Sequence, residues 1–231
     1  MGSFRWDSWD TLIDACRAHN FCIIAVLDEP PEWARQDADF VNSPPRDNRA
    51  YADFVAAFAE RYRGRVDHLQ IWDEPNIYPN WGWRAVDPKA YTALLKEAAQ
   101  RARAANPDSV ILTGALAPNV EPGGANLSDV LFLEEMYRNG ARGSFDVVAA
   151  EPYGFSTGAD DRRVEDSRLN FSRVLNLRQM MVDNGDESRA IWAVEFGWNA
   201  LPPDWSGKPS IWGSVSEEQQ AIATAQAYLR A

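Results

Sequence analysis

The feature that most constrains the fold of this chain is a repeated alternation of short apolar runs with longer stretches of helical periodicity. Five runs have the length and the β-branched, apolar composition of buried strands, at 21–27, 66–72, 110–116, 145–150 and 190–194. Six stretches have helical periodicity, at 6–18, 48–62, 88–105, 127–138, 168–183 and 216–230. A repeated strand-then-helix order predicts an α/β protein with a parallel sheet covered by helices.

The helical stretch that ends at residue 62 illustrates how these helices attach to the sheet. Phe54, Val55, Phe58 and Tyr62 fall on one face of the predicted helix, and the charged residues of this stretch fall elsewhere. Such an apolar stripe predicts a helix that packs on a sheet.

The connections differ in length according to their direction. Helix-to-strand links are short and turn-like, at 63–65, 106–108 and 184–186. Strand-to-helix links are long, at 28–46, 74–87, 117–125, 151–165 and 195–215. In a (β/α)8 barrel the loops that follow the strands build the active site. We therefore expect the functional residues at the carboxyl ends of the strands.

Composition narrows the possible partners. The chain has 231 residues, 45% of them hydrophobic, which fits one globular domain over residues 1–231. With 34 acidic and 23 basic residues, its net charge of -11 repels phosphate backbones and anionic lipids, so no nucleic acid or membrane partner is predicted. The first 20 residues show no secretory signal pattern, and localisation stays undefined. Cys16 and Cys22 are expected to be buried thiols.

Two short strings place a glutamate where a predicted strand stops. One is Ile71-Trp72-Asp73-Glu74-Pro75-Asn76, and the other is Ile191-Trp192-Ala193-Val194-Glu195-Phe196-Gly197-Trp198. A single carboxylate at a strand end is usually a solvated loop residue. Two on parallel strands of one barrel would face each other across its mouth, which is the arrangement that hydrolyses glycosidic bonds.

These strings resemble the two catalytic signatures of the clan-A glycoside hydrolases, which include family 5 cellulases and family 39 β-xylosidases. The resemblance implies that Glu74, on the fourth barrel strand, is the acid/base and that Glu195, on the seventh, is the nucleophile. It implies retaining hydrolysis of a β-linked carbohydrate, with the two carboxyl groups about 5 to 5.5 Å apart. Further likenesses lie at Asp28, after the preceding strand, and at Tyr153, which resembles the clan tyrosine that hydrogen-bonds the nucleophile.

Two residues depart from the clan pattern. Asp73 stands where the clan usually has asparagine, so it can accept a hydrogen bond from a sugar hydroxyl but cannot donate one. Glu151 stands where histidine is common. As many as four carboxylates would then share one pocket, and like charges at such range raise at least one pKa.

Six of the ten tryptophans fall in the long loops: Trp33, Trp81, Trp83, Trp198, Trp205 and Trp212. They can pin the loops to the barrel or offer flat faces to sugar rings. We predict Trp33, Trp81 and Trp198 as sugar-binding residues, together with the loop residues Asp28, Asp73, Glu151 and Tyr153. Trp72 and Trp192, inside strands, are expected in the core, and His68 is expected to be structural.

The resemblance also implies that the barrel is partial. If the strands that end at Glu74 and Glu195 are the fourth and seventh, strands one, two and eight are absent from this sequence, which holds about strands 3 to 7. We expect flanking sequence to supply them, because an incomplete parallel sheet leaves open edges.

Two other functions remain open. A catalytically inactive carbohydrate-binding barrel would keep the tryptophans and lose the geometry of the glutamates. A metal-dependent barrel enzyme could use Asp73, Glu74, Glu151 and Glu195 as oxygen ligands. No histidine pair with ligand spacing supports it, so neither a metal nor a cofactor is predicted.

Overall fold

The computed structural model describes residues 4–230 and contains one open sheet of five strands. The strands are β1 (Ile24–Leu27), β2 (His68–Ile71), β3 (Val110–Leu112), β4 (Val147–Ala150) and β5 (Ala190–Ala193). Their order in the sheet is their order in the chain, and each pairs with the next in parallel. All five predicted strands are confirmed, each shorter than its apolar run.

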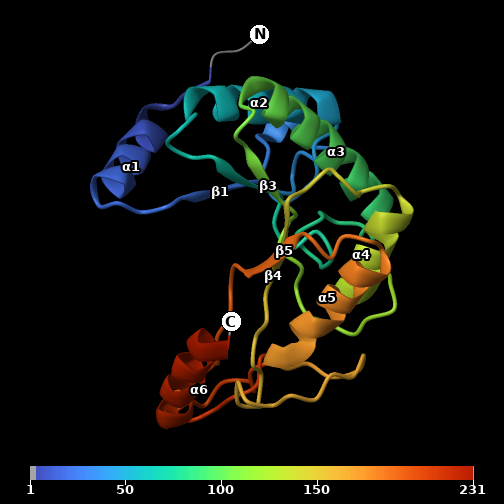
Figure 1. Ribbon diagram of the computed structural model, residues 1–231. Helices are drawn as coiled ribbons and strands as arrows, with labels where there is room; N and C mark the ends of the chain where they lie inside the picture. Colours follow the sequence, from blue (N-terminus) through green and yellow to red (C-terminus); the bar gives the residue numbers. More distant parts are fainter. Residues whose placement is uncertain (1–3, 231) are drawn as a thin grey trace.

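Within residues 4–230, six helices connect or flank the strands. They are α1 (Asp7–Ala18), α2 (Asn48–Arg61), α3 (Pro88–Ala105), α4 (Asp129–Arg138), α5 (Val174–Asp183) and α6 (Glu217–Arg230), with short 3-10 helices η1 (Glu32–Ala34) and η2 (Phe171–Arg173). Figure 1 shows α2 to α5 in an arc along one side of the strands, with α1 and α6 at the two ends of the arc. The helices thus cover one face of the sheet, as the outer ring of a barrel does.

The starts of α2 and α3 follow from capping. The side chain of Asp47 accepts a hydrogen bond from the Arg49 amide, and that of Asp87 accepts one from Ala90. Each carboxylate satisfies an amide that has no partner in the first helical turn. Pro88 then occupies the first position of α3, where its missing N–H costs nothing.

The main core lies between the sheet and its helices. Leu69 and Ile71 of β2 are fully buried on this face, together with Val55 and Phe58 of α2. The predicted apolar stripe of α2 therefore packs as expected, and Trp72 is buried, as predicted.

A second apolar cluster fills the other face of the sheet. It contains Leu112, Val147 and Ala149, with the half-buried Trp192 packed against them. The ring of Trp192 on β5 lies 5.4 Å from that of His68 on β2, although these strands are not neighbours. The sheet is therefore curved, and His68 has the structural role that was predicted.

The sheet does not close within residues 4–230. β1 pairs only with β2, and β5 only with β4. On β1, Ile24 and Val26 are 40% and 45% exposed, although their face belongs to the interior of a barrel. The prediction of a partial barrel is confirmed.

Two details differ from the predictions. Both cysteines are free thiols, but neither is buried as predicted: Cys16 is half-buried, and Cys22 is exposed because it lies just before the uncovered strand β1. The helix expected from residue 168 begins only at Val174, since Asn170 is extended and η2 precedes the helix. None of the helices described is long and apolar enough to cross a membrane.

Candidate active site

Acidic side chains follow four of the five strands. Asp28 comes directly after β1, Asp73 and Glu74 follow β2, Glu151 follows β4, and Glu195 follows β5. Because the strands are parallel, all of these positions lie at one edge of the sheet. The structure thus brings the predicted carboxylates to the predicted end of the barrel.

The backbone around Glu74 is bent into unusual conformations. Trp72 and Glu74 have φ angles of +73° and +41°, which side-chain-bearing residues rarely adopt. The next residue, Pro75, packs so closely on Gly114 that a Cβ there would lie 2.9 Å from Pro75 Cδ. Strained backbone of this kind persists where surrounding contacts hold it.

Polar contacts fix this bend and aim its carboxylates. The indole of Trp72 donates a 2.6 Å hydrogen bond to the carbonyl of Asn80, whose side-chain amide donates to Glu74 Oε2. Gln70 Nε2 donates to Asp73 Oδ1 at 2.8 Å. Glu74 and Asp73 therefore have defined directions before any substrate binds.

Glu195 is held by one residue of the β4 loop. The hydroxyl of Tyr153 donates a 2.5 Å hydrogen bond to Glu195 Oε2. Burial and this hydrogen bond raise the pKa of Tyr153, so the hydroxyl stays a donor. Glu195 itself is exposed, in contrast to the half-buried Glu74.

Glu151 is the most buried acid of the group, with only 2% of its surface exposed. No N–H or O–H group of the described residues donates to either of its carboxyl oxygens. Its neighbour is the carboxyl of Glu74, and two such groups hydrogen-bond only when one keeps its proton. Burial, and then the charge of Glu74, raises the pKa of Glu151 to about 10.

The pKa values of Glu74, Asp73 and Asp28, at the same end of the sheet, are also raised. Burial is the first cause of the raised pKa of Glu74, and the charge of Glu195 adds to it, whereas the nearby carboxyl of Glu151 and the hydrogen bond from Asn80 lower it. Burial, followed by the charges of Glu74 and Glu195, raises the pKa of Asp73 to about 7. Burial also raises the pKa of Asp28. The site can therefore hold protons at neutral pH.

The tryptophans divide into two groups. Trp81 is only 2% exposed and packs between Trp72 and Tyr91, with ring centroids 5.4 and 5.9 Å away. Trp198 is 6% exposed, stacks on Phe171 and donates to the carbonyl of Thr157. The prediction that these two are sugar platforms is wrong, because their loops fold back onto the barrel.

Two exposed tryptophans remain candidates for stacking on a sugar ring. Trp33 is 76% exposed and Trp83 is 70% exposed. Trp83 joins Phe40 and Tyr78 in an aromatic cluster with ring centroids 5.8 to 6.4 Å apart. The sequence alone did not single out this cluster, since Phe40 lies in a different loop from the other two.

Sequence reasoning also missed Asn80 and Gln70, which orient Glu74 and Asp73. Asn80 could have been noticed as an amide in the same loop as Glu74. Gln70 could have been noticed as a polar residue inside an apolar strand.

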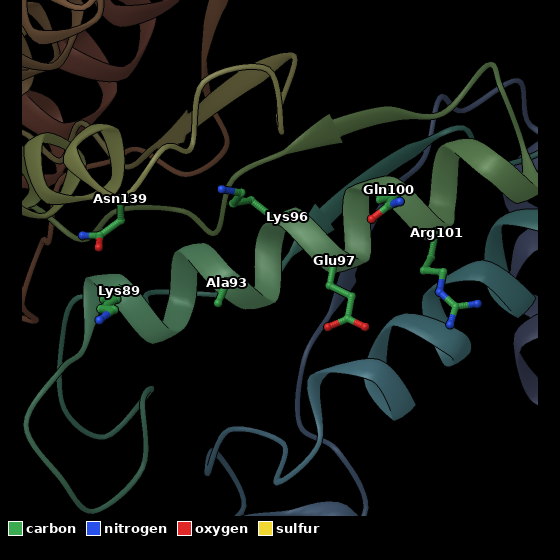
Figure 2. A pocket seen from close by; sticks show the side chains of 7 residues that line it. All are labelled: Lys89, Ala93, Lys96, Glu97, Gln100, Arg101 and Asn139. Atoms are coloured by element: carbon green, nitrogen blue, oxygen red, sulfur yellow. The ribbon is translucent and has the colours of Figure 1, made fainter.

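The described part of the chain offers neither a metal site nor a hollow that displaces the carboxylates as the candidate site. Within residues 4–230, no three His, Cys, Asp or Glu side chains are arranged to hold one metal ion. A hollow lies away from the carboxylates, on the outer surface of α3, lined by Lys89, Lys96, Glu97 and Arg101 among others (Figure 2). Its lining belongs to the solvent side of the helix layer, so we assign the site to the carboxylates.

The chain is similar to known proteins in structure but not in sequence. No model of a known protein family matches the chain, and no curated protein matches its sequence. Solved structures do match. A monomeric β-xylosidase from Caulobacter crescentus CB15 is 22% identical, with a TM-score of 0.63, over 87% of this chain and 42% of that one. A family 39 glycoside hydrolase from Bacteroides cellulosilyticus WH2 is 17% identical, with a TM-score of 0.68, over 99% and 44%.

The chain folds as a partial (β/α)8 barrel. A GH10 structure from Paenibacillus barcinonensis also matches this partial barrel, at 15% identity and a TM-score of 0.54, over 94% of this chain and 62% of that one. The partial barrel spans less than half the length of the first two structures. At these identities the likeness establishes the fold, and the fold predicted from the resemblance is confirmed.

Proposed function

We propose that this chain carries the catalytic pair of a retaining glycoside hydrolase that acts on a β-linked carbohydrate. Glu195 is the nucleophile and Glu74 is the acid/base. The observation that carries the proposal is the contrast between the two acids at one end of the sheet. Glu74 is half-buried with a raised pKa, whereas Glu195 is exposed and accepts a hydrogen bond from Tyr153. Two carboxyl groups in different environments can divide the roles of acid and nucleophile.

The first step forms a covalent intermediate. The Glu195 carboxylate attacks the anomeric carbon while the bond from that carbon to the leaving oxygen breaks, and Glu74 gives its proton to that oxygen. The raised pKa of Glu74 keeps this proton available closer to neutral pH. Tyr153 holds the attacking carboxylate through its hydrogen bond to Oε2.

The second step returns the enzyme to its starting state. Glu74, now a carboxylate, takes a proton from water, and the water oxygen attacks the anomeric carbon. The bond between the sugar and Glu195 breaks, and Glu195 leaves as a carboxylate. Because each step inverts the anomeric centre, the product keeps the configuration of the substrate.

Other residues at the same end of the sheet suit substrate binding. Asp73 can accept a hydrogen bond from a sugar hydroxyl, and Asp28 lies at the end of the neighbouring strand. Trp33 offers an exposed ring to the apolar face of a sugar.

We further propose that flanking sequence of the natural protein supplies strands one, two and eight. The exposed apolar residues of β1 and the unpaired edges of β1 and β5 support this proposal. Parallel sheets are otherwise covered on both faces. Activity is thus expected of the complete protein, in which the experiments below are to be made.

The alternative is an inactive carbohydrate-binding barrel, which the unusual Asp73 and Glu151 favour. Alanine variants of the two proposed catalytic residues discriminate between the two functions. With an aryl β-glycoside, Glu195→Ala should abolish hydrolysis. Glu74→Ala should spare the first step when the leaving group is good, but slow the second step, where general-base assistance is lost.

Added azide sharpens this experiment. Azide should rescue Glu74→Ala and yield a β-glycosyl azide, because a small anion attacks the intermediate without a base. Glu187→Ala, an exposed acid just before β5, should behave as the unmodified protein does. If neither Glu74→Ala nor Glu195→Ala alters turnover, or the complete protein binds sugars without hydrolysing them, the glycosidase function is wrong.

A further inference from the structure

The carboxyl of Glu151 has no explained role in the proposed chemistry. It is 2% exposed, and no described donor reaches either oxygen. A buried carboxylate without a donor is unfavourable, because nothing replaces the water it loses. Glu151 is therefore most stable as a neutral acid, which has a proton to donate.

Among the groups that face Glu151, one is free to accept a hydrogen bond from its protonated carboxyl. Glu74 and Asp73 face it from the β2 loop, Glu195 from the β5 loop and Tyr153 from its own loop. None of these is a cation. Tyr153 donates to Glu195, and Asp73 accepts from Gln70, whereas the carboxyl of Glu74 lies within hydrogen-bonding reach of Glu151.

Glu74 has room for this hydrogen bond. Asn80 donates to Oε2 of Glu74, and no other described side chain outside the carboxylate group donates to it. When Glu74 loses its proton, one amide donor alone would leave a half-buried charge poorly compensated. A second donor would favour the charged form.

Resting on the proposed function, we infer that Glu151 is a positioning residue of the acid/base: it keeps its own proton and donates a hydrogen bond to Glu74 whenever Glu74 is a carboxylate. The proton that reaches the leaving group is that of Glu74. The proton of Glu151 stays on Glu151 throughout, so the reaction balances without it. Its hydrogen bond stabilises the carboxylate formed in the first step and holds it towards water in the second.

Two variants of the complete protein test this role. Glu151→Gln keeps a neutral donor. Its kcat should therefore stay within about threefold of that of the unmodified protein, and the alkaline limb of the pH profile of kcat/KM should not move. Glu151→Leu removes the donor, so Glu74 should lose its proton less easily and the alkaline limb should move up by about one pH unit. With an activated substrate, whose second step limits turnover, kcat should fall about tenfold.

A merely structural role would give a different pattern. Both variants would then lower activity without moving the alkaline limb. The inference would be overturned by that pattern. It would also be overturned if Glu151→Gln and Glu151→Leu had equal pH profiles of kcat/KM, or if the alkaline limb moved down in Glu151→Leu.

Infrared spectroscopy tests whether the carboxyl of Glu151 is protonated, and this test does not depend on hydrolysis. At pH 7 the absorption of protonated buried carboxyls should be present in the complete protein and should fall by the contribution of one carboxyl in Glu151→Gln. That contribution should persist in Glu195→Gln and in the control Glu187→Gln. A spectrum without this absorption, or an absorption that Glu151→Gln leaves unchanged, would refute the inference even if Glu151→Leu failed to fold. Failure of the proposed function is distinguishable, because it would appear as normal turnover by Glu195→Ala.

Discussion

The hydroxyl of Tyr153 donates a 2.5 Å hydrogen bond to Oε2 of Glu195 and so joins the loop after β4 to the end of β5. The bond runs between neighbouring strands of the sheet. It places a neutral donor on one oxygen of the proposed nucleophile. Glu74, after β2, is oriented by Asn80 and lies close to the carboxyl of Glu151.

Tyr153→Phe should lower kcat/KM about 10- to 100-fold in the complete protein. A hydrogen bond to a charged group contributes roughly 1.5–3 kcal/mol, and each 1.4 kcal/mol is about a factor of ten in rate. Steady-state kinetics with an aryl β-glycoside measure the effect. A change below twofold would show that the hydroxyl does not assist Glu195.

Asp73→Asn should remove a pH dependence of stability. Because the folded protein holds a proton on Asp73 up to a pKa of about 7, above the usual 3.8, the folded state binds more protons than the unfolded state between these values. The contribution of Asp73 to the free energy of unfolding therefore falls as pH rises from about 4 to 7.

Urea unfolding at pH 5 and pH 8 measures this effect. Solvent screens the half-buried Asp73, so we expect Asp73→Asn to be more stable than the unmodified protein at pH 8 by on the order of 1 kcal/mol. The difference should shrink towards pH 4. An Asp39→Asn control, on the exposed β1 loop, should show no such trend. A benefit of Asp73→Asn that grew towards low pH would contradict the shift.

Trp33→Ala and Trp81→Ala should have opposite effects. Trp33 is exposed, so its loss should raise KM about 3- to 10-fold through lost stacking and leave stability unchanged. Trp81 is buried against Trp72 and Tyr91, so its loss should cost about 3–5 kcal/mol of stability. Kinetics and urea unfolding of both variants separate binding from packing, and an unchanged KM in Trp33→Ala would remove Trp33 from the proposed site.

A buried ion pair should dominate the stability of the β3 and β4 loops. Arg173 donates to Asp129 Oδ1 at 2.7 Å, and both side chains are almost fully buried. Arg173 also donates to the carbonyls of Asn119 and Asp166, and so ties two loops together. Asp129→Ala should cost about 3–5 kcal/mol, because it leaves a buried cation without its partner.

The exposed ion pairs of Arg138 provide the comparison for Asp129→Ala. Arg138 pairs with Glu134 and Glu135 on the surface of α4, so Arg138→Ala should cost less than about 1 kcal/mol. Urea unfolding measures both losses. If Asp129→Ala and Arg138→Ala lost the same free energy of unfolding, burial would not explain the strength of the Arg173–Asp129 pair.

The strands and helices could be predicted because their signals are local. Apolar runs mark the strands, and turn residues such as those at 63–65 and 184–186 mark the helix-to-strand links. The positions of Glu74 and Glu195 followed from the strand ends alone. The partial barrel followed from counting strands between them with the help of the family resemblance.

The parts that sequence could not predict depend on contacts between distant segments. The burial of Trp81 and Trp198 depends on where their loops fold back, which composition does not encode. Arg173 and Asp129 are 44 residues apart, so nothing local pairs them. The same holds for Glu151, whose oxygens lack donors only because of what packs around the end of β4.

As the proposed nucleophile, Glu195 should form a covalent bond to the sugar. The most direct test is to incubate the complete protein with a 2-deoxy-2-fluoro β-glycoside that carries a good leaving group, and to identify the labelled peptide by mass spectrometry. We expect one fluoroglycosyl group on Glu195, no label in Glu195→Gln, and recovery of activity as the adduct hydrolyses. A label on another residue, or hydrolysis that proceeds with inversion at the anomeric carbon and without any adduct, would contradict this expectation.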